Sequence, residues 1–259
     1  MEYEKIGILG CGWLGMELAK TCIQSGYSVY GSTSTPEKLS IIKSHGIMPF
    51  LVDINNSNEI SLDFFDVDVL IVCITSKNID DYKNLIQRIE ETNLYRVIFI
   101  SSTSVYPNLN KNMTEDDDVL EGNPLVEIEA LFLNHSNINA TILRFAGLFG
   151  GERHPGKWFA NKQIPNPNGF VNMVHRKDCI GVISQVIEKN AWNEVFNVCS
   201  NHHPTRKAFY TQARKALDLN EPTFGDAIQQ SNKNIDSSKV QNILGYKFQV
   251  DDLLKFEWE

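Results

Sequence analysis

The sequence predicts an α/β fold in which a doubly wound parallel sheet is combined with a small C-terminal lobe. The alternation of predicted strands and helices and the length of the chain predict this fold. Short apolar runs alternate with amphipathic stretches through the first half of the chain, and strands that alternate with helices imply right-handed crossovers in a parallel sheet. The length of 259 residues suffices for one large domain, or for one domain with a small lobe.

The elements of the first half follow from the hydrophobic pattern. A strand at residues 6–9, a helix at 13–25 that Gly26 closes and a strand at 27–32 form the first unit of this pattern. Thr35 offers a capping hydroxyl and Pro36 a first-turn proline to a second helix, which Gly46 closes. Further strands are predicted at 47–52, 67–74, 96–100 and 140–143, with a helix at 80–92.

The second half of the chain is less regular. Residues 147–169 contain three prolines and several glycines, so they are predicted to be largely loop. Helices are predicted at 178–189 and 205–217, with a strand at 195–198 between them. We therefore predict a first domain at residues 1–150, followed by a mixed segment at 151–259 that completes the sheet and forms a substrate lobe.

The composition is that of an ordinary globular protein, with 42% hydrophobic and 22% charged residues. A net charge of -8 repels phosphate backbones and argues against nucleic-acid binding. No signal-peptide pattern opens the chain and no apolar run approaches the roughly 20 residues that span a bilayer, so we expect a cytoplasmic protein without membrane attachment. The five cysteines form no CxxC pair and the histidines show no H-x-x-x-H pair, so no metal site is predicted.

A glycine-rich turn follows the first predicted strand and opens the first predicted helix. Its pattern is GxGxxG, in which the glycines allow a tight turn, backbone approach to a pyrophosphate, and close packing of helix on strand. The helix N-terminus adds free N–H groups and partial positive charge. This context predicts a Rossmann dinucleotide-binding domain, with contacts from Gly10, Cys11, Gly12, Trp13, Leu14 and Gly15.

The residues after the second strand bear on the choice of cofactor. An acidic residue that binds the ribose normally stands there, but this chain has hydroxyl residues and no acid before Glu37. Hydroxyls can donate hydrogen bonds to a 2′-phosphate, which a carboxylate would repel, so we predict NADP(H) over NAD(H), with Lys38 nearby. The alternative is that these residues only cap the helix at Pro36. The predicted contacts from strand ends are Ser32, Thr33, Ser34, Asp53 and Thr75.

Later segments resemble extended short-chain dehydrogenases/reductases, the family of NAD-dependent epimerases and dehydratases. Residues 101–106 read SSTSVY and resemble the family's S-S-x-x-V-Y segment, and residues 143–150 read LRFAGLFG and resemble L-R-x-x-x-[IL]-[YF]-G. Residues 171–178 resemble the family's short strand and following helix start, and Asn197-Val198 the start of a later strand. The resemblance implies a Rossmann domain with a C-terminal substrate lobe. It also implies that a Ser or Thr, a Tyr and a Lys cooperate in proton transfer while hydride moves to or from nicotinamide. Family members often dimerise through helices beside the sheet, which makes a homodimer an open expectation.

Two features depart from the family pattern. The family usually has GxxGxxG, whereas Leu9 occupies the extra glycine position here, which indicates an atypical branch. The family's Tyr-x-x-x-Lys is missing, because no tyrosine occurs between Tyr106 and Tyr210. Ser102 matches the family's catalytic hydroxyl by its distance from Tyr106, with Thr103 next to it.

The missing pair leaves two functional hypotheses open. In the first, the protein is an NAD(P)-dependent oxidoreductase or nucleotide-sugar epimerase or dehydratase relative, and Ser102, Thr103 and Tyr106 supply the proton chemistry. Glu127 is an alternative that reads more simply as a solvated helix residue. In the second, the protein is a catalytically silent NAD(P)-binding sensor or regulatory protein. A Rossmann domain for an S-adenosyl donor is disfavoured by the later family segments.

A basic segment lies between Glu152 and Lys177, in an otherwise acidic chain. Such a segment attracts an anionic small molecule such as a nucleotide sugar, and Arg144 and Arg153 are the predicted anion contacts. The alternative is a solvated loop balanced by the acidic run at 115–118. The sequence does not decide between these two interpretations.

Overall fold

The structure is a computed structural model, and it describes residues 3–160, 162–226 and 232–256. The chain divides into two compact units. Unit 1 consists of Met1–Ser101, Glu121–Leu143 and Val186–Val195, and unit 2 of Ser102–Leu120, Arg144–Gln185 and Phe196–Glu259. The chain passes between the two units several times. The division predicted from the sequence has a single boundary, at residue 150, and it stays a prediction.

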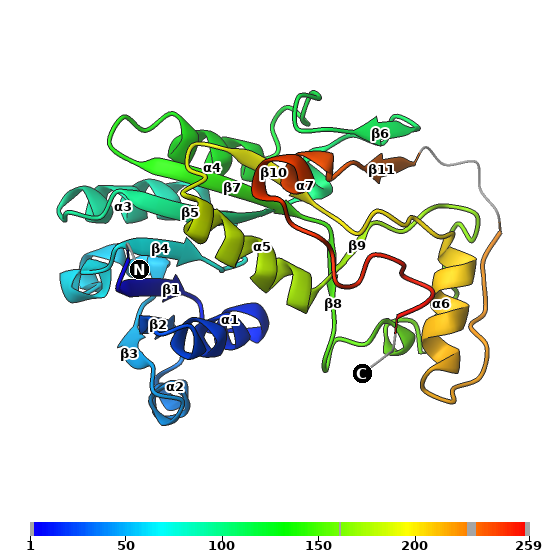
Figure 1. Ribbon diagram of the computed structural model, residues 1–259, viewed down its shortest axis with the longest axis horizontal. Coiled ribbons are helices and arrows are strands. Elements are labelled where there is room, and N and C mark those ends of the chain that lie inside the picture. The colour runs from blue at the N-terminus through cyan, green and yellow to red at the C-terminus, as the bar shows by residue number, and fades with distance from the viewer. Residues whose placement is uncertain (1–2, 161, 227–231, 257–259) are drawn as a thin grey trace. The chain divides into compact units, whose positions relative to one another are not determined.

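The predicted doubly wound parallel sheet is confirmed. Seven strands follow the order β10-β7-β5-β4-β1-β2-β3, and the pairs from β5 to β3 are parallel (Figure 1). The strands are β1 (Lys5–Leu9), β2 (Ser28–Thr33), β3 (Met48–Leu51), β4 (Val69–Val72), β5 (Arg96–Ser102), β7 (Asn139–Phe145) and β10 (Val195–Val198). Chain order reverses at β1, which lies between β2 and β4. That reversal is where open α/β sheets bind ligands, beyond the carboxyl ends of the strands.

Helices cover the sheet with their apolar stripes. In α1 (Trp13–Gln24), the buried side chains of Leu14, Leu18 and Cys22 recur every four residues and form one face. Helices α3 (Ile79–Glu90) and α4 (Pro124–Leu133) run beside one another and pack on β5 (Figure 1). Helix α4 contacts β5 through aromatic side chains: the Phe132 and Phe99 rings are stacked, with their centroids 5.2 Å apart.

The second predicted helix forms with a different start. A 3₁₀ turn at Pro36–Lys38 precedes α2 (Leu39–Ser44), and the hydroxyl of Thr35 makes no capping hydrogen bond within the described residues. Thr33 Oγ1 instead accepts a hydrogen bond from the Thr35 backbone N–H at 3.1 Å. The capping role expected of Thr35 is therefore wrong. The side chain that bonds to the backbone of this turn is that of Thr33.

Unit 2 contains two small parallel sheets of its own. One pairs β8 (Gly147–Phe149) with β9 (Met173–His175), and the other pairs β6 (Lys111–Met113) with β11 (Lys233–Ile235). The helices α5 (Arg176–Lys189) and α6 (Arg206–Lys215) lie close to their predicted bounds, and α7 (Ser238–Leu244) was not predicted. A buried apolar cluster, to which α6 contributes, consists of Phe149, Ile164, Val171, Met173, Phe209, Tyr210, Val250 and Leu253.

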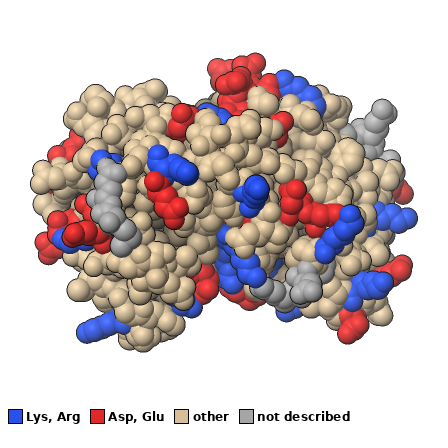
Figure 2. Space-filling view, viewed as in Figure 1, with Lys and Arg blue, Asp and Glu red and all other residues tan. Residues whose placement is uncertain are grey.

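On the face that Figure 2 shows, charged side chains of both signs are interspersed rather than gathered in one field. Such a mixed surface gives little long-range attraction for a polyanion. Across the parts of the chain that the structure describes, we find no helix with the length and apolarity that crossing a membrane requires.

Candidate functional site

The glycine-rich loop between β1 and α1 is held by the end of β2. The backbone N–H of Gly10 donates to Ser32 Oγ at 2.9 Å, and the N–H of Cys11 donates to the Ser32 carbonyl at 2.7 Å. Gly10 has φ +100°, a conformation that other residues rarely adopt. The loop therefore has a defined shape that depends on one glycine and on one serine of the neighbouring strand.

The three glycines of the loop meet very different surroundings. A Cβ atom on Gly15 would lie 2.1 Å from the Gly10 carbonyl oxygen, so only glycine fits there. A Cβ atom on Gly12 would meet no described atom within 4 Å, and Gly12 is exposed at the start of α1 without a side-chain cap. The N-terminus of α1 thus faces open space, which fits the approach of a pyrophosphate to free N–H groups.

The cofactor contacts predicted from strand ends divide into buried and exposed residues. Ser32 is only 1% exposed and its hydroxyl is already bonded to the loop. Ser34 and Thr75 are exposed, and Asp53 is exposed with its Oδ1 accepting from the Asn55 N–H at 3.0 Å. The structure therefore brings Ser32 to the loop as a support, and its direct contact with a cofactor stays a prediction.

Cys11 belongs to the packing of the loop. Its side chain is 9% exposed, and a Cβ atom on Gly31 would lie 2.6 Å from its Sγ. Burial raises the pKa of the Cys11 thiol to about 12, with the backbone of Ser32 opposing this effect. Burial therefore keeps this thiol protonated at neutral pH.

The predicted catalytic residues lie at the last position of β5 and in the turn just after it, and they belong to unit 2. Ser102 is half-buried, and its Oγ accepts from the Ser104 N–H at 3.1 Å at the start of a 3₁₀ turn. Thr103 is buried in the same turn. Their predicted catalytic roles stay predictions.

Tyr106 and Arg144 form one buried pair. The Tyr106 hydroxyl donates to Asn197 Oδ1 at 2.8 Å and accepts from Arg144 Nη1 at 2.6 Å. Tyr106 is 1% exposed and Arg144 is 6% exposed. Burial raises the pKa of the Tyr106 phenol, although Arg144 and Asn197 oppose this effect. The roles of Tyr106 in proton transfer and of Arg144 as an anion contact stay predictions.

The partners of this pair were not predicted as site residues. Asn197 stands in a segment that resembles the family, and its backbone N–H donates to Glu115 Oε1 at 2.6 Å. Burial raises the pKa of the Glu115 carboxyl. Glu115 is half-buried and belongs to the acidic run at 115–118, so charge alone gave no signal that one of its members packs against Asn197.

A buried glutamate lies in unit 1. Glu129 of α4 is 2% exposed, and its Oε1 accepts from the Ser101 hydroxyl at 2.5 Å. Glu127, two residues earlier, is exposed in the first turn of α4, as its interpretation as a solvated helix residue expects. In the basic segment, Arg153 is exposed and Arg176 pairs with Glu152 at 3.5 Å.

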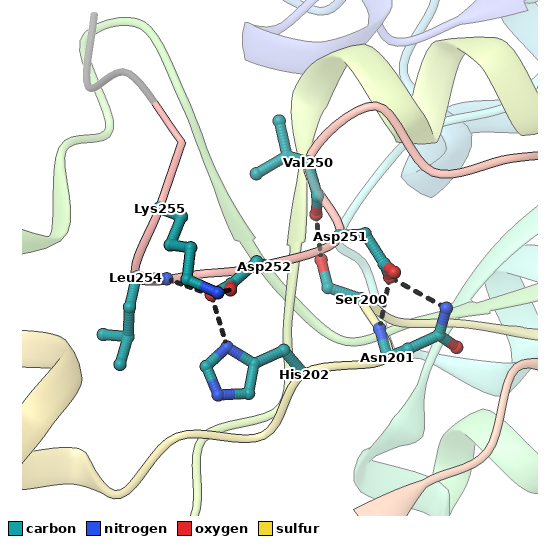
Figure 3. Close-up of polar contacts among 8 residues, drawn as sticks. All are labelled: Ser200, Asn201, His202, Val250, Asp251, Asp252, Leu254 and Lys255. Carbon is teal, nitrogen blue, oxygen red and sulfur yellow. Dashed lines mark hydrogen bonds and ion pairs between the residues drawn. The ribbon is translucent and has the colours of Figure 1, made fainter.

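The C-terminal segment of unit 2 is fastened by a group of polar side chains (Figure 3). Asp252 pairs with His202 at 2.7 Å and with Lys255 at 2.9 Å, and Asp251 accepts from the N–H of Asn201 at 3.0 Å. In the described ranges, no three histidine, cysteine or acidic side chains gather as metal ligands would. The contacts of Asp251 and Asp252 attach the C-terminal segment to Asn201 and His202 within unit 2.

Comparisons with known proteins give matches over most of the chain. Residues 10–190 match a family described as NAD(P)H-binding. The chain is 32% identical to Protein YeeZ of Escherichia coli over 269 aligned positions, which cover 97% of this chain and 98% of that protein. The match begins at the first glycine of the loop.

Solved structures with little sequence identity share the fold. A putative NAD-dependent epimerase/dehydratase from Methylobacillus flagellatus has a TM-score of 0.79 at 22% identity, covering 96% of this chain and 94% of that chain. The dTDP-glucose 4,6-dehydratase of Bacillus anthracis, solved in complex with NAD, has a TM-score of 0.80 at 16% identity, covering 97% and 94%. At these identities the likeness concerns the fold.

Proposed function

Because the chain belongs to the NAD(P)H-binding family, we propose that it binds NADP(H), with NAD(H) as the second choice, and acts as an oxidoreductase or nucleotide-sugar epimerase or dehydratase relative. The observation that supports this most is the open space at Gly12, in front of the first N–H groups of α1. A dinucleotide needs its pyrophosphate against such a helix N-terminus. We keep the predicted cytoplasmic setting and homodimer as parts of the proposal.

The residues that would hold the cofactor are those of the loop and of the ends of β2, β3 and β4. When bound, the nicotinamide supplies or accepts a hydride. Ser102 and Thr103 are the hydroxyls that this proposal assigns to proton transfer. Arg153, which is exposed, is the contact it assigns to an anionic substrate such as a nucleotide sugar.

The preference for NADP(H) depends on the absence of an acid after β2. Residues 31–35 read GSTST, and the first carboxylate is that of Glu37, which is exposed. A carboxylate at this place hydrogen-bonds a ribose 2′-hydroxyl and repels a 2′-phosphate. Thr33 and Ser34 supply hydroxyls instead, and Lys38 supplies positive charge.

Calorimetric titration of the purified chain with NADPH, NADP⁺, NADH and NAD⁺ tests the proposal. Micromolar binding, with NADP(H) tighter than NAD(H), is the expected result. Tighter NAD(H) binding would contradict the cofactor preference alone. Failure to bind any of the four would contradict the proposed function as a whole.

A catalytically silent NAD(P)-binding sensor is the second candidate. It is favoured by the buried hydroxyl of Tyr106, which is bonded on both sides, in a chain that lacks Tyr-x-x-x-Lys. A screen of nucleotide sugars and small carbonyl compounds, followed through the absorbance of the reduced cofactor, separates the candidates. Turnover of any compound excludes the silent one.

A further inference from the structure

A hollow of about 590 Å³ opens in unit 1 at the amino ends of three sheet strands. It is lined by residues just before or at the starts of β1, β4 and β5, so it lies at the strand ends opposite to those that the glycine-rich loop follows. The volume is within the usual range of small-molecule sites, about 300 to 1,000 Å³. We call it the amino-edge hollow, and its charged lining residues are Glu4, Lys5, Asp66, Asp68 and Arg96.

Three of these five charges are used within the protein. Lys5 Nζ pairs with Asp66 Oδ2 at 2.6 Å. Asp68 Oδ2 accepts from the backbone N–H groups of Glu4 and Lys5, at 2.7 and 2.9 Å. These contacts fasten the start of β1 to the turn before β4 and hold that wall of the hollow in place.

Arg96 and Glu4 remain for a ligand. The guanidinium of Arg96 lies over the rings of Tyr95 and Tyr3, with its carbon 4.2 and 4.9 Å from their centroids. Within the described residues, Arg96 makes no hydrogen bond or ion pair, and its Nε is buried. The Glu4 carboxylate is likewise unbonded there, and the residue is exposed. A stacked guanidinium that is fixed in position but unsatisfied is suited to a carboxylate.

The positions of the two groups set the size of the ligand. Strand β4 lies between β1 and β5. At about 4.8 Å per neighbouring pair, the starts of β1 and β5 are therefore about 10 Å apart. Glu4 and Arg96 line the same hollow, and a separation of this order suits a compact head group with two charges that the two side chains contact from either end.

The charge balance indicates which head group fits. The lining has three acidic and two basic residues, so a simple anion would be repelled by the acids, and a simple cation would leave Arg96 unpaired. Leu62, which is 39% exposed, adds apolar surface to the same hollow, and the buried side chains of Phe65 and Leu94 lie in its lining. We propose that the amino-edge hollow binds a free α-amino acid with an apolar side chain, its carboxylate on Arg96 and its ammonium group on Glu4.

Calorimetry with three related probes tests this assignment on the full-length, untagged chain. L-phenylalanine carries both charges, 3-phenylpropionate lacks the ammonium group, and 2-phenylethylamine lacks the carboxylate. We expect L-phenylalanine to bind about tenfold more tightly than either relative, which corresponds to one lost ionic contact. Equal binding of 3-phenylpropionate, or no binding of L-phenylalanine and L-leucine, would overturn the proposal.

Two variants assign the two ends of the ligand. Arg96→Gln should remove the preference for L-phenylalanine over 2-phenylethylamine, and Glu4→Gln should remove the preference over 3-phenylpropionate. Arg88→Gln is the matched control, because Arg88 is a half-buried arginine of unit 1 outside the hollow, paired with Glu91 at 2.5 Å. Glu4 is exposed, so its variant stays informative even if Arg96→Gln unfolds. A preference that survives Glu4→Gln contradicts the assignment.

Discussion

Gly12 and Gly15 stand three residues apart in one loop, and an added methyl group would affect them in opposite ways. At Gly15 it would collide with the backbone of Gly10, whereas at Gly12 it would enter open space. The sequence predicted all three glycines of this loop, because their spacing has a direct geometric meaning. It did not predict that the Ser32 hydroxyl supports the loop, because a hydrogen bond from a loop to a neighbouring strand leaves no spacing pattern in the chain.

Gly12→Ala should weaken dinucleotide binding and leave the fold intact. The new methyl group meets no described atom, and the backbone φ of -85° suits alanine, so the melting temperature should stay close to that of the wild type. Loss of close phosphate approach should raise Kd about tenfold or more, equivalent to ~1.4 kcal/mol. Gly225→Ala in unit 2 is the control, since a Cβ atom added there would lie 3.8 Å from the nearest atom. Unchanged cofactor affinity in Gly12→Ala would place the pyrophosphate elsewhere.

Ser32→Ala should reduce both stability and cofactor affinity. It leaves the Gly10 N–H without its acceptor, a loss of about 1 to 3 kcal/mol in the free energy of unfolding. Thr141→Val is matched, because the buried Thr141 hydroxyl donates to the Ala191 carbonyl at 2.7 Å in the same unit. Denaturant unfolding should show similar losses in both variants. Calorimetry should show weaker cofactor binding only in Ser32→Ala, and an equal effect in both would assign Ser32 a purely structural role.

At the scale of elements, length decided what the sequence could predict. Buried strands and three helices of the first half were found because several residues repeat a pattern, whereas the helix α4 was not predicted. The strands β6 and β11 have three residues each and pair across more than a hundred positions, so neither has a detectable period. The bond from the Asn232 N–H to Asn110 Oδ1 beside them spans 122 positions. Such pairings are tertiary facts that a local pattern cannot contain.

Helix starts offer a test of this difference between pattern and structure. Asn78 caps α3, because its side chain accepts from the Asp80 N–H at 3.1 Å, whereas Thr35 has no such bond. Asn78→Ala should lower the free energy of unfolding by about 1 kcal/mol. Thr35→Ala should cost clearly less in the same denaturant titration. A larger loss for Thr35 would restore the capping role that the sequence indicated.

The acid stability of the whole molecule depends on carboxyl groups with opposite shifts. The pKa of Asp252 is lowered from 3.8 to about 2, first by Lys255, then by the Leu254 N–H and by His202. A lowered pKa stabilises the fold above the ordinary value, and this contribution is lost as the pH falls from about 4 to 2. Burial raises the pKa values of Glu115 and Asp178, which therefore act in the opposite sense as they are protonated.

Asp252→Asn should flatten the acid branch of the stability curve. Thermal unfolding of wild type and variant should differ most at neutral pH and converge towards pH 2, since the wild type loses its ion pairs there. Asp226→Asn is a control, being an exposed aspartate in the same unit. A constant difference between Asp252→Asn and wild type across this range would show that Asp252 acts through neutral hydrogen bonds.

The interleaved order of the two units has a consequence for synthesis. Unit 1 takes its last segment from Val186–Val195, and the apolar cluster of unit 2 takes Val250 and Leu253 from the end of the chain. A ribosome that has made only the first half has therefore delivered all the segments of neither unit. The sheet stays incomplete until β10 has been made, and a fragment ending at residue 150 lacks the final segment of unit 1.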